Sequence, residues 1–191
     1  MRDRLLAAYL RLPEHPAKFR LARALGRWVF PADGIVAPIN SAGPGVRLHL
    51  HPRDWIEYEL LRGKPYEPLT LEFLRRNLRA GDTALLAGVN NGLHVIVAAQ
   101  AVGPRGCVIG VEPQPDALVR ARKNIALNGF EGTVRMVAGA LGDVSALVPM
   151  AWSSPENTAP RACWRRPRGF SYRSCSFPPC CIQRVKGGRC S

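Results

Sequence analysis

Residues 82–113, DTALLAGVNNGLHVIVAAQAVGPRGCVIGVEP, constrain this chain more than any other stretch. An aliphatic run from Ala84 to Ala87 leads to Gly88 and a polar turn, a helical pattern follows Gly92, and a second aliphatic run ends at Glu112. This order predicts strand, turn, helix and strand, with the turn and the acid at the carboxyl edge of a parallel sheet, where open α/β folds bind ligands. Amides at a helix N-terminus and a carboxylate that can accept hydrogen bonds from ribose hydroxyls are typical of a nucleoside-cofactor site.

Helical and strand patterns continue to alternate from residue 70 to residue 143. We expect a helix that starts with Thr70 as its N-cap, a second helix over residues 115–128, and a third strand from Val134 to Val137. The predicted fold class is therefore α/β, a Rossmann-like sheet of which this chain holds the first β-α-β-α-β half.

The preceding residues 1–65 read as a leader of helices and one strand. Residues 1–31 have the spacing of two amphipathic helices with basic opposite faces, and residues 46–51 alternate like a half-buried strand. Asp54 is placed to cap a following short helix. His49 and His51 share one face of the strand; a pair at this spacing can hold a metal, but a solvent-facing pair is the favoured interpretation, and we expect no metal site.

Composition changes abruptly near residue 150. The net charge is +13, and residues 151–191 hold eight of the 27 basic residues, one of the 14 acidic residues and five of the six cysteines. Prolines interrupt this segment, which shows no helical or alternating pattern. We therefore divide the chain into a leader (1–65), the cofactor-binding half of a Rossmann-like domain (66–148) and a basic tail rich in Cys and Pro (149–191), which we expect to be disordered.

Three interpretations of this tail compete. The cysteines lack paired C-x-x-C spacing, which argues against a metal knuckle. Arginines interleaved with Trp164, Phe170 and Tyr172 would suit contact with nucleic acid. The favoured interpretation is that a G+C-rich gene is read out of frame past about codon 145, because such a shift yields this mixture of Arg, Pro, Ser, Cys and Gly.

The turn also bears on which nucleoside cofactor fits. A dinucleotide site needs G-x-G-x-x-G, in which the second glycine lets the pyrophosphate approach the backbone, and Asn90 stands at that position here. A cofactor without phosphate needs less clearance.

The span from Tyr66 to Asp143 resembles the cofactor half of the FkbM family of class I S-adenosylmethionine-dependent methyltransferases. The matching pieces are Y-E-P-L-T (66–70), G-D-T (81–83), G-V-N-N-G (88–92), G-P-R-G (103–106), V-E-P (111–113), R-K-N-I-A-L-N-G (122–129) and A-L-G-D (140–143).

The resemblance implies a role for several residues. The turn beneath the methionine moiety of S-adenosylmethionine would be formed by Gly88, Asn90 and Gly92. Glu112 would bind the ribose hydroxyls, and Asp143 would lie near the adenine. Glu67 would reach the amino-acid end of the cofactor from the preceding loop. No catalytic residue is assigned.

Leu86 departs from the family pattern D-x-G-A-N, which has an aspartate two residues before the first glycine. Losing that charge-assisted hydrogen bond removes roughly 1.5–3 kcal/mol. We therefore expect cofactor affinity to be roughly tenfold to hundredfold weaker.

The sequence as a whole favours a methyltransferase, with O-methyl transfer to a small-molecule or saccharide hydroxyl, in a form that is truncated and inactive if the tail replaces the rest of the fold. Two other functions remain open: a basic nucleic-acid-binding protein and a fragment that binds a nicotinamide dinucleotide. No run approaches the ~20 apolar residues of a membrane span. We expect a cytoplasmic chain.

Overall fold

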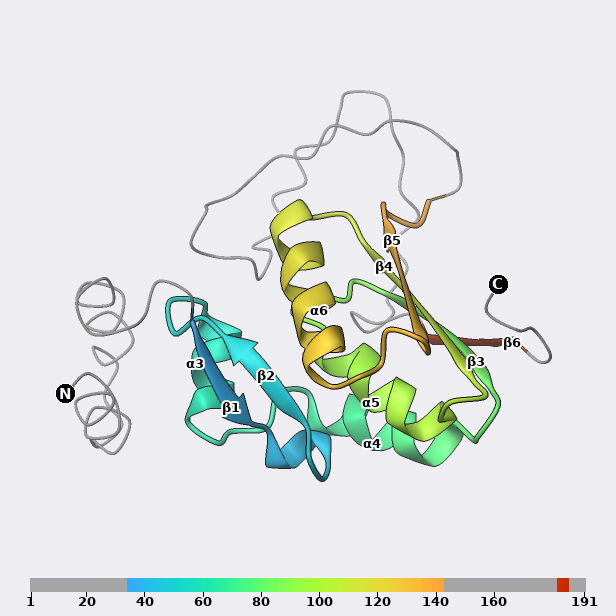
Figure 1. The fold of residues 1–191 in the computed structure, drawn as a ribbon, viewed down its shortest axis with the longest axis horizontal. Helices are drawn as coiled ribbons and strands as arrows, with labels where there is room; N and C mark the ends of the chain where they lie inside the picture. The colour runs from blue at the N-terminus through green and yellow to red at the C-terminus, as the bar shows by residue number, and fades with distance from the viewer. Residues whose placement is uncertain (1–33, 143–181, 186–191) are drawn as a thin grey trace.

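The computed structural model describes residues 34–142 and 182–185 (Figure 1). The predicted helices of residues 1–31, Asp143 and most of the tail lie outside the described residues. In the described part, no helix is both long enough and apolar enough to span a bilayer.

A four-stranded sheet forms the centre of the described fold. Its strands are β3 (Thr83–Ala87), β4 (Cys107–Glu112), β5 (Val134–Ala138) and β6 (Ile182–Val185), in the order β5-β4-β3-β6. The first three are parallel, as predicted, with Thr83 opposite Cys107 and Val108 opposite Val134. The expected β-α-β-α-β half of a Rossmann-like fold is confirmed.

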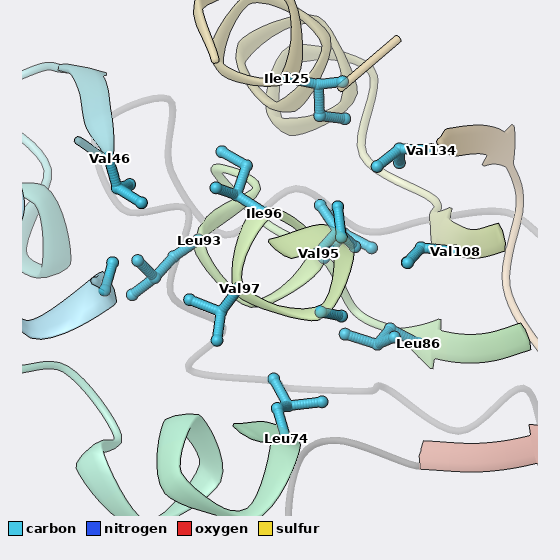
Figure 2. Packing of buried hydrophobic residues seen from close by; sticks show 14 of the residues in the cluster. Val46, Leu74, Leu86, Leu93, Val95, Ile96, Val97, Val108, Ile125 and Val134 are labelled. Carbon is cyan, nitrogen blue, oxygen red and sulfur yellow. The ribbon is translucent and has the colours of Figure 1, made fainter. Parts of the chain in front are cut away.

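Helices α4 (Pro68–Asn77), α5 (Leu93–Val102) and α6 (Pro115–Leu127) lie along one face of this sheet (Figure 1). Both crossovers step in the same direction along the sheet, and right-handed connections then place α5 and α6 on the same side. Helix α5 lies between α4 and α6 and packs against the sheet (Figure 2). Its residues from Leu93 to Ala99 are all buried and, apart from His94, apolar, as expected for a helix that other elements surround.

Helix α4 begins three residues earlier than predicted, so the expectation that Thr70 is its N-cap is wrong. Glu67 is the N-cap, in a left-handed conformation with φ 45°, and Pro68 follows at the first helical position. Proline favours this start because its φ is preset for a helix and its missing N–H is not needed there. Thr70 instead donates its backbone N–H to the Glu67 carbonyl.

The strand β6 differs from the expected disordered tail. Residues 182–185 pair antiparallel with β3, with Thr83 opposite Val185. An open edge of β3 would present unpaired N–H and C=O groups, and a short segment with β-branched residues at both ends can satisfy them. This strand lies at the edge of the sheet, in a segment whose sequence shows no alternating pattern.

The leader contains a hairpin and a short helix. Strands β1 (Ile35–Pro38) and β2 (Arg47–Leu50) pair antiparallel, a 3-10 turn η1 (Asn40–Ala42) lies between them, and α3 (Trp55–Leu61) follows. The predicted Asp54 cap is confirmed, because its side chain accepts hydrogen bonds from the N–H groups of Ile56 and Glu57.

Two asparagines, one in α6 and one at its C-cap, attach this hairpin to the Rossmann half. The Asn124 amide accepts from the N–H of His49 at 2.6 Å and donates to its carbonyl at 3.4 Å. Asn128 makes the same pair of bonds to Arg47, at 3.0 and 2.7 Å. Four residues of a helix advance about 6 Å, and two residues of a strand advance about 6.8 Å. The spacing of the two asparagines therefore matches the spacing of the two strand residues that they bind. We call this pair of contacts the amide ladder.

The amide ladder yields a prediction about stability. Asn124 is 0% exposed and also donates to the Asn91 carbonyl at 2.8 Å, whereas Asn128 lies nearer the surface. Asn124→Ala removes hydrogen bonds to buried backbone groups, so we expect it to lower the free energy of unfolding by about 2–4 kcal/mol, against about 1 kcal/mol for Asn128→Ala. Urea denaturation measures both, and equal losses would contradict a special role for Asn124.

Candidate functional site

The turn between β3 and α5 has three left-handed residues. Gly88 has φ 78°, Asn90 has φ 52° and Gly92 has φ 94°. The Gly88 N–H donates to the Val111 carbonyl at 2.9 Å, so the turn begins while still attached to β4. A Cβ at Gly92 would lie 3.2 Å from Cα of Ala121, so this glycine also lets the turn approach α6.

Glu112 lies beside this turn, as the sequence predicts. It is the last residue of β4 and is 5% exposed. Its Oε2 accepts from the Asn90 N–H at 2.8 Å, and its Oε1 accepts from the Gln114 N–H at 3.0 Å. A carboxylate has about four acceptor positions. Glu112 can therefore hold the turn and still accept hydrogen bonds from a ligand.

Asn90 adds an unused acceptor to the same place. Its side-chain Oδ1 is buried, and no hydrogen-bond donor of the described residues contacts it. A buried oxygen without a donor is costly, and a ligand N–H or O–H would satisfy it. The site thus fits a ligand rich in donors.

Glu67 joins the site from the start of α4. Its Oε2 lies 3.3 Å from Nε2 of His94, which belongs to the first turn of α5. Burial, and then the charge of the neighbouring Glu67, raise the pKa of Tyr66 to about 12. The fold therefore brings Glu67, Gly88, Asn90, Gly92 and Glu112 to the carboxyl edge of the sheet or the start of α5, whereas Asp143 lies outside the described residues and stays a prediction.

Sequence reasoning missed the polar residues that support the turn from behind. The Asn91 side chain accepts from the N–H of Leu93, the first residue of α5, at 3.2 Å, while its carbonyl accepts from Asn124. Glu57 of α3 lies behind the turn as well, where the Asn91 side chain acts to lower the pKa of Glu57. The signal available was the R-K-N-I-A-L-N-G run, which carries its two asparagines four residues apart on one helix.

Glu57 is an unusual acid because it is 1% exposed. Burial above all, and then the Asp54 charge, raise the pKa of Glu57 to about 7, while Arg120 acts in the opposite direction. Its Oε1 lies 3.2 Å from Nε of Arg120, which is an ion-pair distance without the alignment of a hydrogen bond. Its Oε2 accepts from the His51 N–H.

The two histidines of the hairpin lie side by side, with ring centroids 5.3 Å apart. Burial, and then the charge of His49, lower the pKa of His51. Within residues 34–142 and 182–185, His, Cys, Asp and Glu side chains nowhere gather in groups of three that could hold a metal ion.

Leu86 stands where the FkbM pattern has its aspartate, and its side chain is 1% exposed. It packs in the core with Leu74, Val95 and Val108, under α5 (Figure 2). The position thus contributes to the core of this chain, and no acid from β3 reaches the turn.

A parallel β-α-β-α-β unit with a glycine turn and an acid at its carboxyl edge is typical of Rossmann-like domains that bind nucleoside cofactors. A family model described as Protein-L-isoaspartate(D-aspartate) O-methyltransferase (PCMT) matches residues 64–146. Protein-L-isoaspartate O-methyltransferase 1 of Archaeoglobus fulgidus is 39% identical over 67 residues, which are 35% of this chain and 31% of the relative. An arsenite methyltransferase of Halobacterium salinarum is 42% identical over 62 residues, which are 32% of this chain and 16% of the relative.

A solved methyltransferase from Geobacter sulfurreducens superposes with a TM-score of 0.33 and 18% identity, covering 72% of this chain and 58% of that one. The sequence matches support the expected class, the class I S-adenosylmethionine-dependent methyltransferases, over the region that contains β3 to β5. The matched model is PCMT rather than FkbM, so the FkbM assignment stays a prediction. This chain spans about a third or less of the length of these two curated relatives.

The raised pKa of Glu57 predicts a pH dependence of stability. The folded state keeps this proton up to about pH 7, whereas the unfolded chain releases it near the ordinary pKa of 4.5. The contribution of protonated Glu57 to the free energy of unfolding is therefore full below pH 4.5. It is lost as the pH rises to 7, and the loss amounts to about 3 kcal/mol at most. Glu57→Gln cannot titrate and should flatten this part of the profile, measured by denaturation between pH 4.5 and 8. An unchanged slope in the variant would contradict the assignment.

Restoring the acid of the family pattern should fail in this chain. Leu86→Asp places an unpaired carboxylate in the apolar core, and we expect a loss of at least about 3 kcal/mol in the free energy of unfolding. Leu86→Asn, which has nearly the same shape without the charge, should be more stable than the Asp variant at pH 8. Thermal unfolding compares them. A Leu86→Asp protein as stable as the wild type would show that the position faces the site.

Proposed function

We propose that residues 66–148 are the S-adenosylmethionine-binding half of a methyltransferase. The observation that carries the proposal is the hydrogen bond from the Asn90 N–H to Glu112 at 2.8 Å, which ties the glycine turn after β3 to the acid that ends β4. The residues matched by the methyltransferase family model include both partners.

Each end of the cofactor has a matching group in this proposal. Glu112 accepts hydrogen bonds from the ribose hydroxyls with the acceptor positions that Asn90 and Gln114 leave open. Gly88 and Gly92 keep the turn free of side chains beneath the methionine moiety. Glu67 receives the ammonium group at the amino-acid end, and Asp143 is proposed near the adenine.

A phosphate-containing dinucleotide fits this turn less well. The Asn90 side chain occupies the position where a dinucleotide site has its second glycine. The Asn90 N–H, which would otherwise bind a phosphate oxygen, already donates to a carboxylate. The nucleic-acid alternative depends on residues outside the described part of the chain, and no described feature favours it.

Bound S-adenosylmethionine supplies an electrophilic methyl group. The contribution of this chain is to bind and orient it, which by itself can supply much of the acceleration in a displacement reaction. We propose transfer to an oxygen acceptor. The FkbM resemblance favours a small-molecule or saccharide hydroxyl, and the PCMT match favours the carboxyl group of an isoaspartyl residue. Transfer of labelled methyl to an isoaspartyl peptide or to saccharides would distinguish the two.

Binding of S-adenosylhomocysteine tests the proposed site. We expect heat of binding in calorimetry with the wild-type chain, and roughly tenfold to hundredfold weaker affinity for Glu112→Gln, because a charge-assisted acceptor for the ribose is lost. The matched control is Glu131→Gln, which changes an exposed acid away from the turn and should bind like the wild type. No heat at millimolar ligand, or equal affinities for all three proteins, would contradict the proposal.

A further inference from the structure

His94 is a buried imidazole to which the sequence motifs assign no role. It is 7% exposed and lies two residues after Gly92, in the first turn of α5. Its Nε2 is buried and makes no aligned hydrogen bond among the described residues, yet Oε2 of Glu67 lies 3.3 Å away. The Tyr66 ring lies on the same side, with its centroid 6.2 Å from that of His94.

From this contact we infer that His94 is a positioning residue for Glu67 and makes recognition of the cofactor's ammonium group dependent on pH. This inference rests on the proposed function, because it assigns a role within the same site. A neutral imidazole with its Nε2 3.3 Å from one oxygen of Glu67 fixes the position of the carboxylate and leaves the other oxygen for the ammonium. A protonated imidazole would pair with the carboxylate and repel the ammonium.

The surroundings of His94 keep it neutral near pH 7. Burial lowers the pKa of His94 below its ordinary value of 6.5, and the Glu67 carboxylate partly opposes this effect. The positive end of the α5 dipole also disfavours a cation in the first helical turn. The ionisable groups around it are Glu67 and Tyr66 from the start of α4, with Glu57 and Arg120 one contact further away behind Asn91.

Two ligands separate this role from a general structural one. S-adenosylhomocysteine carries the ammonium, whereas 5′-methylthioadenosine has the same nucleoside and a thioether but no amino-acid end. Calorimetry of both with the full chain should show that His94→Leu and Glu67→Gln weaken S-adenosylhomocysteine about tenfold and leave methylthioadenosine unchanged. His94→Gln keeps an N–H donor and should restore most of the affinity.

The pH profile gives a second readout. Wild-type affinity for S-adenosylhomocysteine should fall as the pH decreases from 8 to 5, while His94→Gln should lose the part of this fall that comes from His94. Glu57→Gln is the matched control, because it removes the titration of Glu57 alone. This variant should keep the part of the pH dependence that comes from His94.

Several outcomes would overturn the inference. These are an equal loss for both ligands in His94→Leu, a wild-type pH profile in His94→Gln, or unchanged binding in every variant. If neither ligand binds the wild-type chain, the proposed function itself fails and this inference fails with it. If both ligands bind the wild-type chain and the His94 variants bind them with wild-type affinity, the proposed function stands and only the inference about His94 fails.

Discussion

The side-chain amide of Asn124 is the interaction on which the arrangement of this site depends. It lies on α6, is fully buried, and bonds at once to β2 through His49 and to the glycine turn through Asn91. Apolar contacts between the hairpin and the Rossmann half are not directional, so they would allow the two parts to slide. Hydrogen bonds are directional and permit one register, and the bond from Asn124 to the Asn91 carbonyl is buried. The amide ladder therefore sets where the turn lies relative to the leader.

Two acids act on opposite sides of this turn, and their surroundings give them different properties. Glu112 lies at the carboxyl edge of the sheet and accepts hydrogen bonds from two backbone N–H groups. Glu57 lies behind the turn, where burial favours the protonated form, and its pKa rises to about 7. The three left-handed residues of the turn carry a conformational cost, most of it at Asn90, which has a Cβ. The bond from Asn90 to Glu112 offsets that cost.

Local patterns predicted much of this fold. The strands β3 to β5 could be predicted because each is a short aliphatic run bounded by turn residues, and the carboxyl-edge rule then placed Glu112 beside the turn. The predicted start of α4 was wrong. Thr70 is a good N-cap in isolation, but Pro68 fixes the start of the helix, so that its N-cap lies three residues earlier than predicted. The contacts of Asn124, Glu57 and His94 were not predictable. Each of these side chains contacts a residue far away in the sequence, and sequence patterns place polar residues on the surface. The strand β6 escaped prediction since its pairing depends on the open edge of β3.

The charges around the turn restrict which ligands it can hold. Glu112 lies at the end of β4 and Glu67 at the start of α4, so the described site presents carboxylates and the unsatisfied oxygen of Asn90. Groups that donate hydrogen bonds or carry positive charge complement such a surface, and phosphates do not. In the proposed site, Glu67 is the acid for the ammonium end of an aminoacyl nucleoside, because Leu86 packs in the core. Under this proposal Glu67, which lies beside His94, has a task for which the FkbM pattern provides an additional aspartate.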